Sequence, residues 1–291
     1  MNKSVKTICL LLTLVMCVTA MPLAAVARDD GTLRIVSSNV LFDDTRDTVY
    51  RMHCLAETYA RLDADIICLQ EARPRQMAAL YPLMDDYERV TFIDVQDDLM
   101  YQQMLYRKDD FTVVKSGFTR FRDGVIPWGV SWVVFRRNSD GRRFAVMSTH
   151  LTIISDTYDK GASNSVEGVQ YRKNDCNTIL SLITTLRRTY ADIPVLVCGD
   201  WNAQVGAVEL EEIDNSAFMR DAMKVATVSA DTKTSTAHKI CRMPSANGGD
   251  IIDHIYVSVD TLEVLTHQII ADGVVIQGSD HCPVVAQVKF K

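Results

Sequence analysis

The segment Val195–Ala203 reads V-L-V-C-G-D-W-N-A, and its pattern predicts a buried strand that ends in two polar residues. A short apolar run that stops at a turn residue, here Gly199, is typical of a strand covered on both faces. Asp200 and Asn202 then lie on a loop held by a rigid element, where catalytic side chains are commonly placed. An aspartate can accept a proton or hold a cation, and an asparagine can donate to a phosphate oxygen. The same pattern is also an ordinary Asp/Asn turn, so alone it leaves both interpretations open.

Two apolar runs near the N-terminus end in the same manner. Leu33–Asn39 alternates and predicts a strand with Asn39 at its tip, where a capping role is the alternative. Ile66–Glu71 predicts a second strand that delivers Glu71 after four apolar residues. A glutamate is costly to bury unless it is paired or binds a cation, so Glu71 is a candidate metal ligand.

A hairpin in the middle of the chain places a histidine at a strand end. The turn Asn138–Gly141 separates two runs with β-branched and aromatic residues, and the second run ends at His150. A lone histidine at a strand end is more often structural than catalytic, so His150 alone indicates little.

Two motifs near the C-terminus combine aspartate and histidine. Ile251–Ser258 reads as a strand that buries Asp253, and Gly278–Pro283 contains the pair Asp280-His281 before a closing strand at 284–290. A carboxylate beside a histidine can fix its tautomer and stabilise the imidazolium, as acid–base catalysis requires.

The remaining pattern alternates helices with short strands. We predict helices over 47–62, 73–83 and 167–190, strands over 101–106, 112–118 and 130–135, short helices before Lys224, and polar loops at 155–165 and 231–249. Arg172, near the start of the third helix, could reach a phosphate, with a solvated arginine as the alternative. The loop after His150 is a candidate rim of the site.

The first 27 residues predict a secretory signal peptide rather than part of the fold. Lys3 and Lys6 precede an apolar run, and Ala25-Val26-Ala27 provides small residues for cleavage after Ala27. Residues 28–291 then form a single domain without a transmembrane segment, and the mature protein is expected to be secreted or periplasmic.

The net charge bears on the class of substrate, and the cysteine content bears on possible disulfides. Without residues 1–27 the chain keeps 29 Lys and Arg against 37 Asp and Glu, a net charge of about −8 that argues against a duplex-binding protein. Six cysteines remain in the mature chain. Cys68 and Cys198 lie in apolar runs and are expected to be buried, so a disulfide would draw on the other four, Cys54, Cys176, Cys241 and Cys282.

Taken together, the motifs resemble the endonuclease/exonuclease/phosphatase superfamily, which includes secreted deoxyribonucleases, abasic-site endonucleases, bacterial sphingomyelinases, inositol polyphosphate 5-phosphatases and deadenylases. They occur in the order of that family and span residues 33–290; they are S-S-N-V, L-Q-E, S-T-H-L, G-D-W-N, I-D-H-I and S-D-H-C-P-V. Leu41 stands where the abasic-site branch carries an aspartate, which weakens that assignment. The resemblance implies an α/β fold, a four-layered αββα sandwich of two packed mixed β-sheets flanked by helices.

The resemblance also implies a metal side of the site. Glu71 matches the principal Mg²⁺ ligand of the family, with Asn39 beside it at the metal and the phosphate, and Asp280 near the metal. Mg²⁺ favours oxygen ligands, so the chemistry of these residues is apt, although Mn²⁺ or Ca²⁺ would also fit.

The acid–base side is implied in the same way. Asp200 matches the residue that aligns or deprotonates the attacking water, and Asn202 matches a phosphate contact. His281, oriented by Asp253, matches the histidine at the scissile phosphate, and His150 matches the second histidine of the deoxyribonuclease and sphingomyelinase branches.

These matches predict a secreted, divalent-metal-dependent phosphoesterase that acts by metal-assisted attack of water. The acidic charge favours a small organic phosphoester or a lipid headgroup over nucleic acid as substrate. An extracellular endonuclease or exonuclease is the alternative, and a non-catalytic binding module that retains the fold is a further one. We expect a monomer without a stable protein partner.

Overall fold

The computed structural model describes residues 31–92, 101–121, 128–153 and 165–291. The predicted signal peptide and most of the predicted loop 155–165 lie outside these ranges. Two mixed β-sheets form the centre of the described chain.

The first sheet has seven strands, and its middle is built from both ends of the domain. β1 pairs in parallel with β2 and antiparallel with the last strand, β13. In spatial order the strands are β10 (Val228–Ser229), β12 (Leu262–Ile269), β13 (Val284–Phe290), β1 (Thr32–Asn39), β2 (Ile66–Gln70), β4 (Gln103–Arg107) and β3 (Tyr87–Arg89).

The second sheet has six strands, and the G-D-W-N strand lies within it. β8 pairs in parallel with β7 and antiparallel with β11. In spatial order the strands are β5 (Phe111–Arg120), β6 (Gly129–Arg137), β7 (Arg143–His150), β8 (Val195–Asp200), β11 (Asp253–Ser258) and β9 (Met219–Asp221).

The sequence of β8 explains why the two sheets pack together. Successive side chains of a strand point to opposite faces, and all six residues of β8 are buried. Leu196 and Cys198 belong to the core that includes the facing residues of the first sheet, whereas Val195 and Val197 belong to the core under a long helix. An apolar run without alternation is therefore the pattern of a strand covered on both faces.

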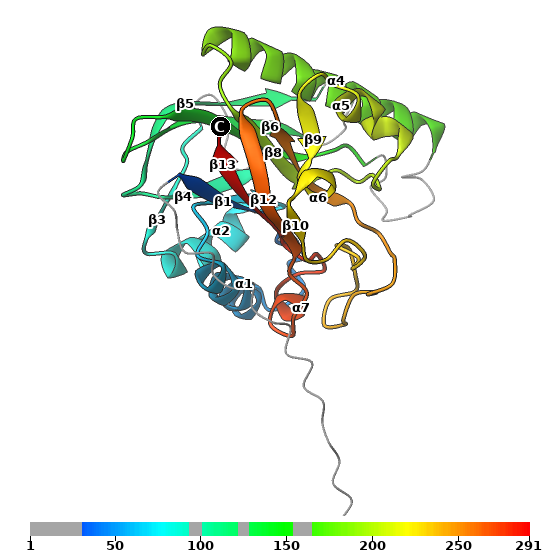
Figure 1. Ribbon diagram of the computed structural model, residues 1–291. Helices are drawn as coiled ribbons and strands as arrows, with labels where there is room; N and C mark the ends of the chain where they lie inside the picture. The colour runs from blue at the N-terminus through cyan, green and yellow to red at the C-terminus, as the bar shows by residue number, and fades with distance from the viewer. Residues whose placement is uncertain (1–30, 93–100, 122–127, 154–164) are drawn as a thin grey trace, which may run out of the picture. The chain divides into compact units, whose positions relative to one another are not determined.

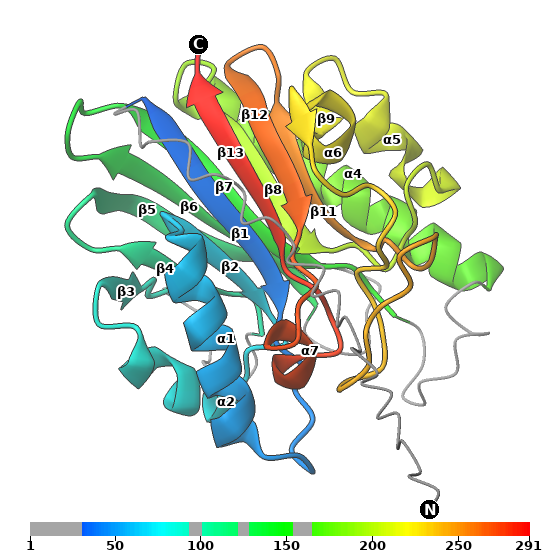
Figure 2. The ribbon, with the colours of Figure 1, turned by 60° about the horizontal axis from the view of Figure 1, so that its bottom comes forward.

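Helices cover the outer faces of both sheets. Figure 1 shows α4 on one side of the strands and α1 on the other, and Figure 2 shows α1 and α2 lying across the first sheet. The described helices are α1 (Thr48–Leu62), α2 (Pro74–Leu80), η1 (Tyr81–Leu83), α4 (Val166–Thr189), η3 (Val208–Leu210), α5 (Glu211–Asp214), α6 (Ala222–Val225) and α7 (Val275–Gly278). The predicted four-layered sandwich is confirmed. No helix among the described residues is long and apolar enough to cross a membrane.

The two longest helices begin at side-chain caps. Asp47 accepts a hydrogen bond from the backbone N–H of Tyr50 at the start of α1, and Ser165 accepts one from Gly168 at the start of α4. Such caps satisfy backbone donors that have no partner within the helix.

The short strands β9, β10 and β3 and the strand β12 were not expected from the sequence. β12 reads L-E-V-L-T-H-Q-I and mixes polar residues into its second half, where the pairing with β13 shifts register between Val264 and Thr266. The bulge interrupts the alternation that a strand prediction needs. Cys68 and Cys198 are buried, as expected, and all six cysteines of the described chain are free, so the structure contains none of the disulfides that the other four permitted.

The buried side chain of His267 on β12 gives a testable pH dependence of stability. Burial lowers the pKa of His267 to about 4, and its Nδ1 lies 3.4 Å from the hydroxyl of Ser229. The unfolded chain therefore binds this proton more readily, so the contribution is complete above the ordinary pKa of 6.5 and is lost as the pH falls towards about 4.

We expect His267→Gln to lose less stability than the wild type between about pH 7 and about pH 4.5, by up to about 3 kcal/mol in urea unfolding. His53→Gln, at an exposed position on α1, is the control and should follow the wild-type curve. Parallel curves for the wild type and His267→Gln would contradict the assignment.

Candidate functional site

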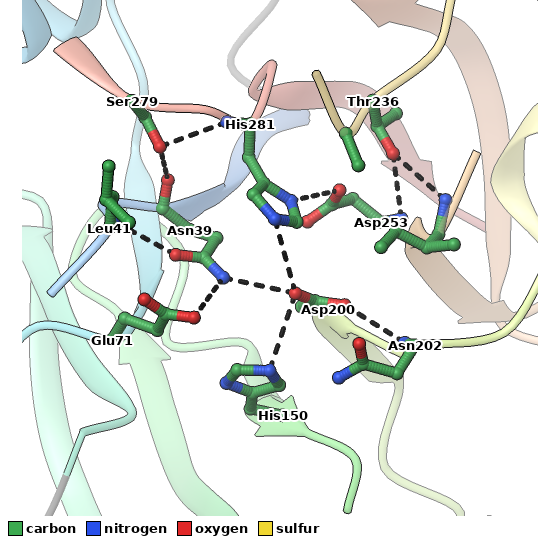
Figure 3. A network of polar contacts seen from close by, with 12 residues as sticks. Asn39, Leu41, Glu71, His150, Asp200, Asn202, Thr236, Asp253, Ser279 and His281 are labelled. Atoms are coloured by element: carbon green, nitrogen blue, oxygen red, sulfur yellow. Dashed lines mark hydrogen bonds and ion pairs between the residues drawn. The ribbon is translucent and has the colours of Figure 1, made fainter. Parts of the chain in front are cut away.

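Strand ends from both sheets meet at one end of the sandwich. Asn39 ends β1 opposite Gln70, the last residue of β2, so Glu71 follows immediately beside it. In the second sheet, Asp200 at the end of β8 lies in register with His150 on one side and Asp253 on the other. Parallel neighbours place their carboxyl ends at the same edge, which is how distant segments are brought together. Figure 3 shows the resulting cluster.

Asp200 is the centre of the polar network. Its Oδ2 accepts a hydrogen bond from Asn39 Nδ2 at 3.1 Å and lies 3.4 Å from His150 Nε2 and 3.7 Å from His281 Nε2. Asn39 Nδ2 also donates to Oε1 of Glu71 at 3.1 Å. One amide therefore joins the two carboxylates that come from different sheets.

Asn39 performs the capping role as well. Its Oδ1 accepts the backbone N–H of Leu41 at 3.0 Å, which leaves the amide nitrogen for Glu71 and Asp200. The capping interpretation of this asparagine is thus confirmed, and its role at a metal and a phosphate stays a prediction.

Glu71 is held in a strained and buried conformation. Its φ is 58°, a left-handed value that a glutamate rarely adopts, and its Oε2 accepts the backbone N–H of Phe42 at 2.9 Å. Burial, with the charge of the half-buried Asp280 as a second cause, raises its pKa to about 7. Neither hydrogen-bond donor carries a charge, so a bound cation would stabilise the ionised form of this carboxylate.

His281 is oriented by Asp253. Its Nδ1 lies 2.8 Å from Asp253 Oδ2, and its backbone N–H donates to Ser279. Burial opposes the charged imidazole, but Asp253 and Asp200 outweigh it and raise the pKa of His281 well above its ordinary value. The two carboxylates therefore favour the charged form of the imidazole of His281. Burial, with Asp200 as a further cause, raises the pKa of Asp253.

Asp200 is ionised beside this imidazolium. Burial alone would raise its pKa, but the neighbouring His150 and His281, together with the hydrogen bonds from Asn202 and Asn39, lower it on balance. The Asp200 carboxylate is thus a proton acceptor at neutral pH.

The pKa of His150 shifts in the opposite direction to that of His281. It is fully buried, burial lowers its pKa to about 4, and neither ring nitrogen makes a hydrogen bond. The indole of Trp128 packs edge-on against it, with ring centroids 4.1 Å apart. Burial therefore favours the neutral imidazole of His150, whose Nε2 faces Asp200 Oδ2 at 3.4 Å.

Asn202 lies on the loop after β8 with a φ of 47°. Its backbone N–H donates to Asp200 Oδ1 at 3.0 Å, and its Nδ2 donates to the carbonyl of Leu151 at 3.1 Å. The first bond is the Asp/Asn turn that the sequence allowed. The contact of Asn202 with a phosphate stays a prediction.

The described residues contain one group of three that could hold a metal ion. Asp200, Asp253 and His281 each offer a ligand atom, and these atoms lie within 4.8 Å of one another. Together with Glu71, they give the site an excess of buried carboxylates over positive charge. That excess, in oxygen-rich surroundings without cysteine, fits a hard divalent cation.

Arg172 is not the solvated arginine of the alternative interpretation, which is wrong, and its contact with a phosphate stays a prediction. Its side chain is fully buried in α4, where its guanidinium pairs with Glu209 of η3 at 2.8 Å. The partner comes from a short helix far along the chain, and the helical pattern around Arg172 carries no trace of it.

Three side chains that the sequence did not identify contact the candidate site residues. Thr236 accepts the backbone N–H of Asp253 at 3.1 Å, Ser279 donates to the carbonyl of Asn39 at 2.7 Å, and Trp128 packs on His150. Ser279 precedes Asp280 in the S-D-H motif, so its turn-forming hydroxyl was a usable signal. Thr236 and Trp128 lie outside every motif.

Solved structures with the same fold cover most of the chain. An endonuclease/exonuclease/phosphatase from Bacteroides vulgatus is 21% identical with a TM-score of 0.75, and covers 89% of this chain and 99% of its own. For a mannosyl-6-phosphatase from Bacteroides thetaiotaomicron the identity is 19%, the TM-score 0.74, and the coverage 89% and 100%. For the human Nocturnin catalytic domain with bound sulfate the values are 18%, 0.67, 90% and 95%. At these identities the likeness shows the fold alone.

Sequence comparison is informative at the level of the family. None of the curated proteins compared with the chain matches it. The model of the Endonuclease/Exonuclease/phosphatase family, however, matches residues 36–281, a range that contains every residue of the polar network. The chain belongs to the endonuclease/exonuclease/phosphatase family.

Proposed function

We propose that this protein is a divalent-metal-dependent phosphoesterase that hydrolyses a phosphodiester or phosphomonoester by attack of water. The observation that carries the proposal is the arrangement around Asp200, which lies between a charged and a neutral histidine and is joined through Asn39 to Glu71. Phosphoester hydrolysis requires an oriented water, neutralisation of the phosphate oxygens and a proton for the leaving oxygen. The network contains a group for each of these tasks.

We place the metal at Glu71, with Asn39 and Asp280 beside it, and favour Mg²⁺ over Mn²⁺ or Ca²⁺. The bound cation would neutralise charge on the phosphate as a Lewis acid. The alternative position, between Asp200, Asp253 and His281, would compete with the hydrogen bond of 2.8 Å from His281 Nδ1 to Asp253. Glu71 has no such charged partner, so a cation there gains more.

Asp200 and His281 would carry the two proton transfers. The ionised carboxylate of Asp200 accepts a proton from the attacking water, and Asn202 contacts a phosphate oxygen. His281, charged and held by Asp253, stabilises the phosphate and donates a proton from Nε2 to the leaving oxygen. The neutral His150 hydrogen-bonds an oxygen of the substrate.

The substrate we favour is a small organic phosphoester or a lipid headgroup. The net charge of about −8 without residues 1–27 supports this choice, because neutralisation of phosphates supplies much of the affinity for nucleic acid. A structural neighbour described as a mannosyl-6-phosphatase is consistent with a small substrate. An extracellular nuclease is the second candidate, and the two histidines favour it. We also propose export, with cleavage after Ala27 of the leader with its two lysines and apolar run.

Substitution of the two sides of the site tests the assignment. We expect Glu71→Ala and His281→Ala each to lower turnover by about 100-fold or more, because one removes the cation ligand and the other the proton donor. Glu57→Ala and His53→Ala, at exposed positions on α1, are matched controls and should keep wild-type rates. Steady-state kinetics on folded protein, checked by circular dichroism, measures the effect, and wild-type rates for Glu71→Ala or His281→Ala would remove the assignment.

Removal of the metal distinguishes a metal-dependent enzyme from a non-catalytic binding module. We expect a chelator to abolish turnover of bis-p-nitrophenyl phosphate, because it removes the cation that neutralises charge on the phosphate. Added Mg²⁺ should restore turnover. Sphingomyelin, inositol phosphates and plasmid DNA complete the substrate panel. Turnover that persists with chelator would exclude the metal, and no turnover of any phosphoester under any metal would favour the binding module.

Salt dependence separates the two substrate classes. A nuclease should bind an oligonucleotide with an affinity that falls steeply as salt rises, because each neutralised phosphate releases counterions. We expect weak oligonucleotide binding by this acidic protein, measured by fluorescence anisotropy at several salt concentrations. Tight binding with a steep salt slope would support the nuclease instead.

A further inference from the structure

Arg51 is a buried arginine that binds backbone carbonyls in two separate segments. Its side chain projects from α1 and is 2% exposed. The guanidinium donates to the carbonyls of Val40 and Leu41 at 2.9 Å each, of Asp43 at 3.2 Å, and of Gly278 at 3.0 Å. Three acceptors follow the end of β1, and the fourth is the last residue of α7.

The four hydrogen bonds of Arg51 go to neutral carbonyls, and the nearby carboxylates of Asp43, Asp280 and Glu71 offset only part of the cost of its burial. Burial disfavours the charged guanidinium and lowers the pKa of Arg51. An apolar side chain would pack in this position at lower cost. The planar fork of an arginine, however, can hold several acceptors in fixed directions at once, which an apolar residue or a lysine cannot do.

The first segment leads directly to the proposed metal side of the site. Leu41, whose carbonyl Arg51 binds, has a φ of 57° and donates its N–H to Asn39. The next residue, Phe42, donates its N–H to Glu71. Arg51 therefore stabilises the strained turn that directs both Asn39 and Glu71.

The second segment leads to the imidazolium side. Gly278 precedes Ser279, whose hydroxyl donates to the carbonyl of Asn39 and accepts the backbone N–H of His281. Figure 1 and Figure 2 show α7 beside α1, near the end of β1. Arg51 and Ser279 therefore both link the segment that follows β1 to the segment that follows α7.

We infer that Arg51 is a positioning residue that fixes the Asn39–Glu71 side of the site relative to the Asp280–His281 side. This inference rests on the proposed function, since the distance between the two sides matters for metal binding and for phosphoester hydrolysis. Arg51 binds carbonyls of the supporting chain rather than substrate, so it acts through the residues it holds. Supporting bonds of this kind commonly change metal affinity or activity by about 10- to 100-fold.

The test compares Arg51→Met with Arg61→Met in two measurements. Arg61 lies on the same helix and pairs with Asp272 at 2.9 Å, so it also ties α1 to the segment before α7, but at the surface. Mn²⁺ binding is measured by calorimetry without substrate, and kcat and KM are measured with Mg²⁺ well below each melting temperature. We expect Arg51→Met to weaken Mn²⁺ binding and lower kcat by about 10- to 100-fold, and Arg61→Met to change neither.

A chemical rescue separates positioning from simple destabilisation. The cavity in Arg51→Ala should accept methylguanidinium at low millimolar concentration and recover part of the lost kcat with saturation. A merely unstable variant would lose activity instead, because guanidinium compounds favour unfolding. Should Arg51→Met fail to fold, Arg51→Lys and Ser279→Ala replace it, with the same expectation for Mn²⁺ affinity and kcat.

Wild-type Mn²⁺ affinity and kcat in the folded Arg51 variants would overturn the inference, as would an equal loss in Arg61→Met. These outcomes differ from failure of the proposed function, in which the wild type itself shows no metal-dependent turnover. The calorimetric measurement does not depend on the substrate chosen.

Discussion

The structure depends on the burial of several carboxylates where the two sheets meet. Glu71, Asp200 and Asp253 are almost inaccessible to solvent and come from three different strand ends. A buried charge is tolerated only when it is compensated, and His281 and the buried guanidinium of Arg51 supply positive charge against them. The carboxylates that stay uncompensated are the physical reason to propose a divalent cation here.

The fold creates this concentration of charge by register. His150, Asp200 and Asp253 occupy paired positions on three adjacent strands, and Asn39 is paired with the residue before Glu71 on the other sheet. The left-handed backbone at Glu71 and Asn202 then turns each side chain or backbone donor towards the centre. Rigid strands fix where each side chain begins, and strained turns at their ends set its direction. The site therefore needs both sheets to be formed before it exists.

Part of this arrangement could be predicted from the sequence, because four of the candidate residues end an apolar run. Asn39, Glu71, His150 and Asp200 all follow strands whose composition is unambiguous, and the order of the motifs indicated the family and hence the two-sheet sandwich. Strand β12 was harder, since a bulge breaks its alternation. The pairing of Arg172 with Glu209 and the bond of Arg51 to Gly278 could not be predicted, because these partners lie on distant segments that local patterns do not report.

The most direct test of the central claim is to locate the metal in crystals grown with Mn²⁺. Anomalous scattering should give a peak in contact with the carboxylate of Glu71, with the His281–Asp253 hydrogen bond intact. A peak between Asp200, Asp253 and His281, with Glu71 turned away, would contradict the proposed position of the metal. The absence of any peak in this cluster at saturating Mn²⁺ would contradict the account of the site as a whole.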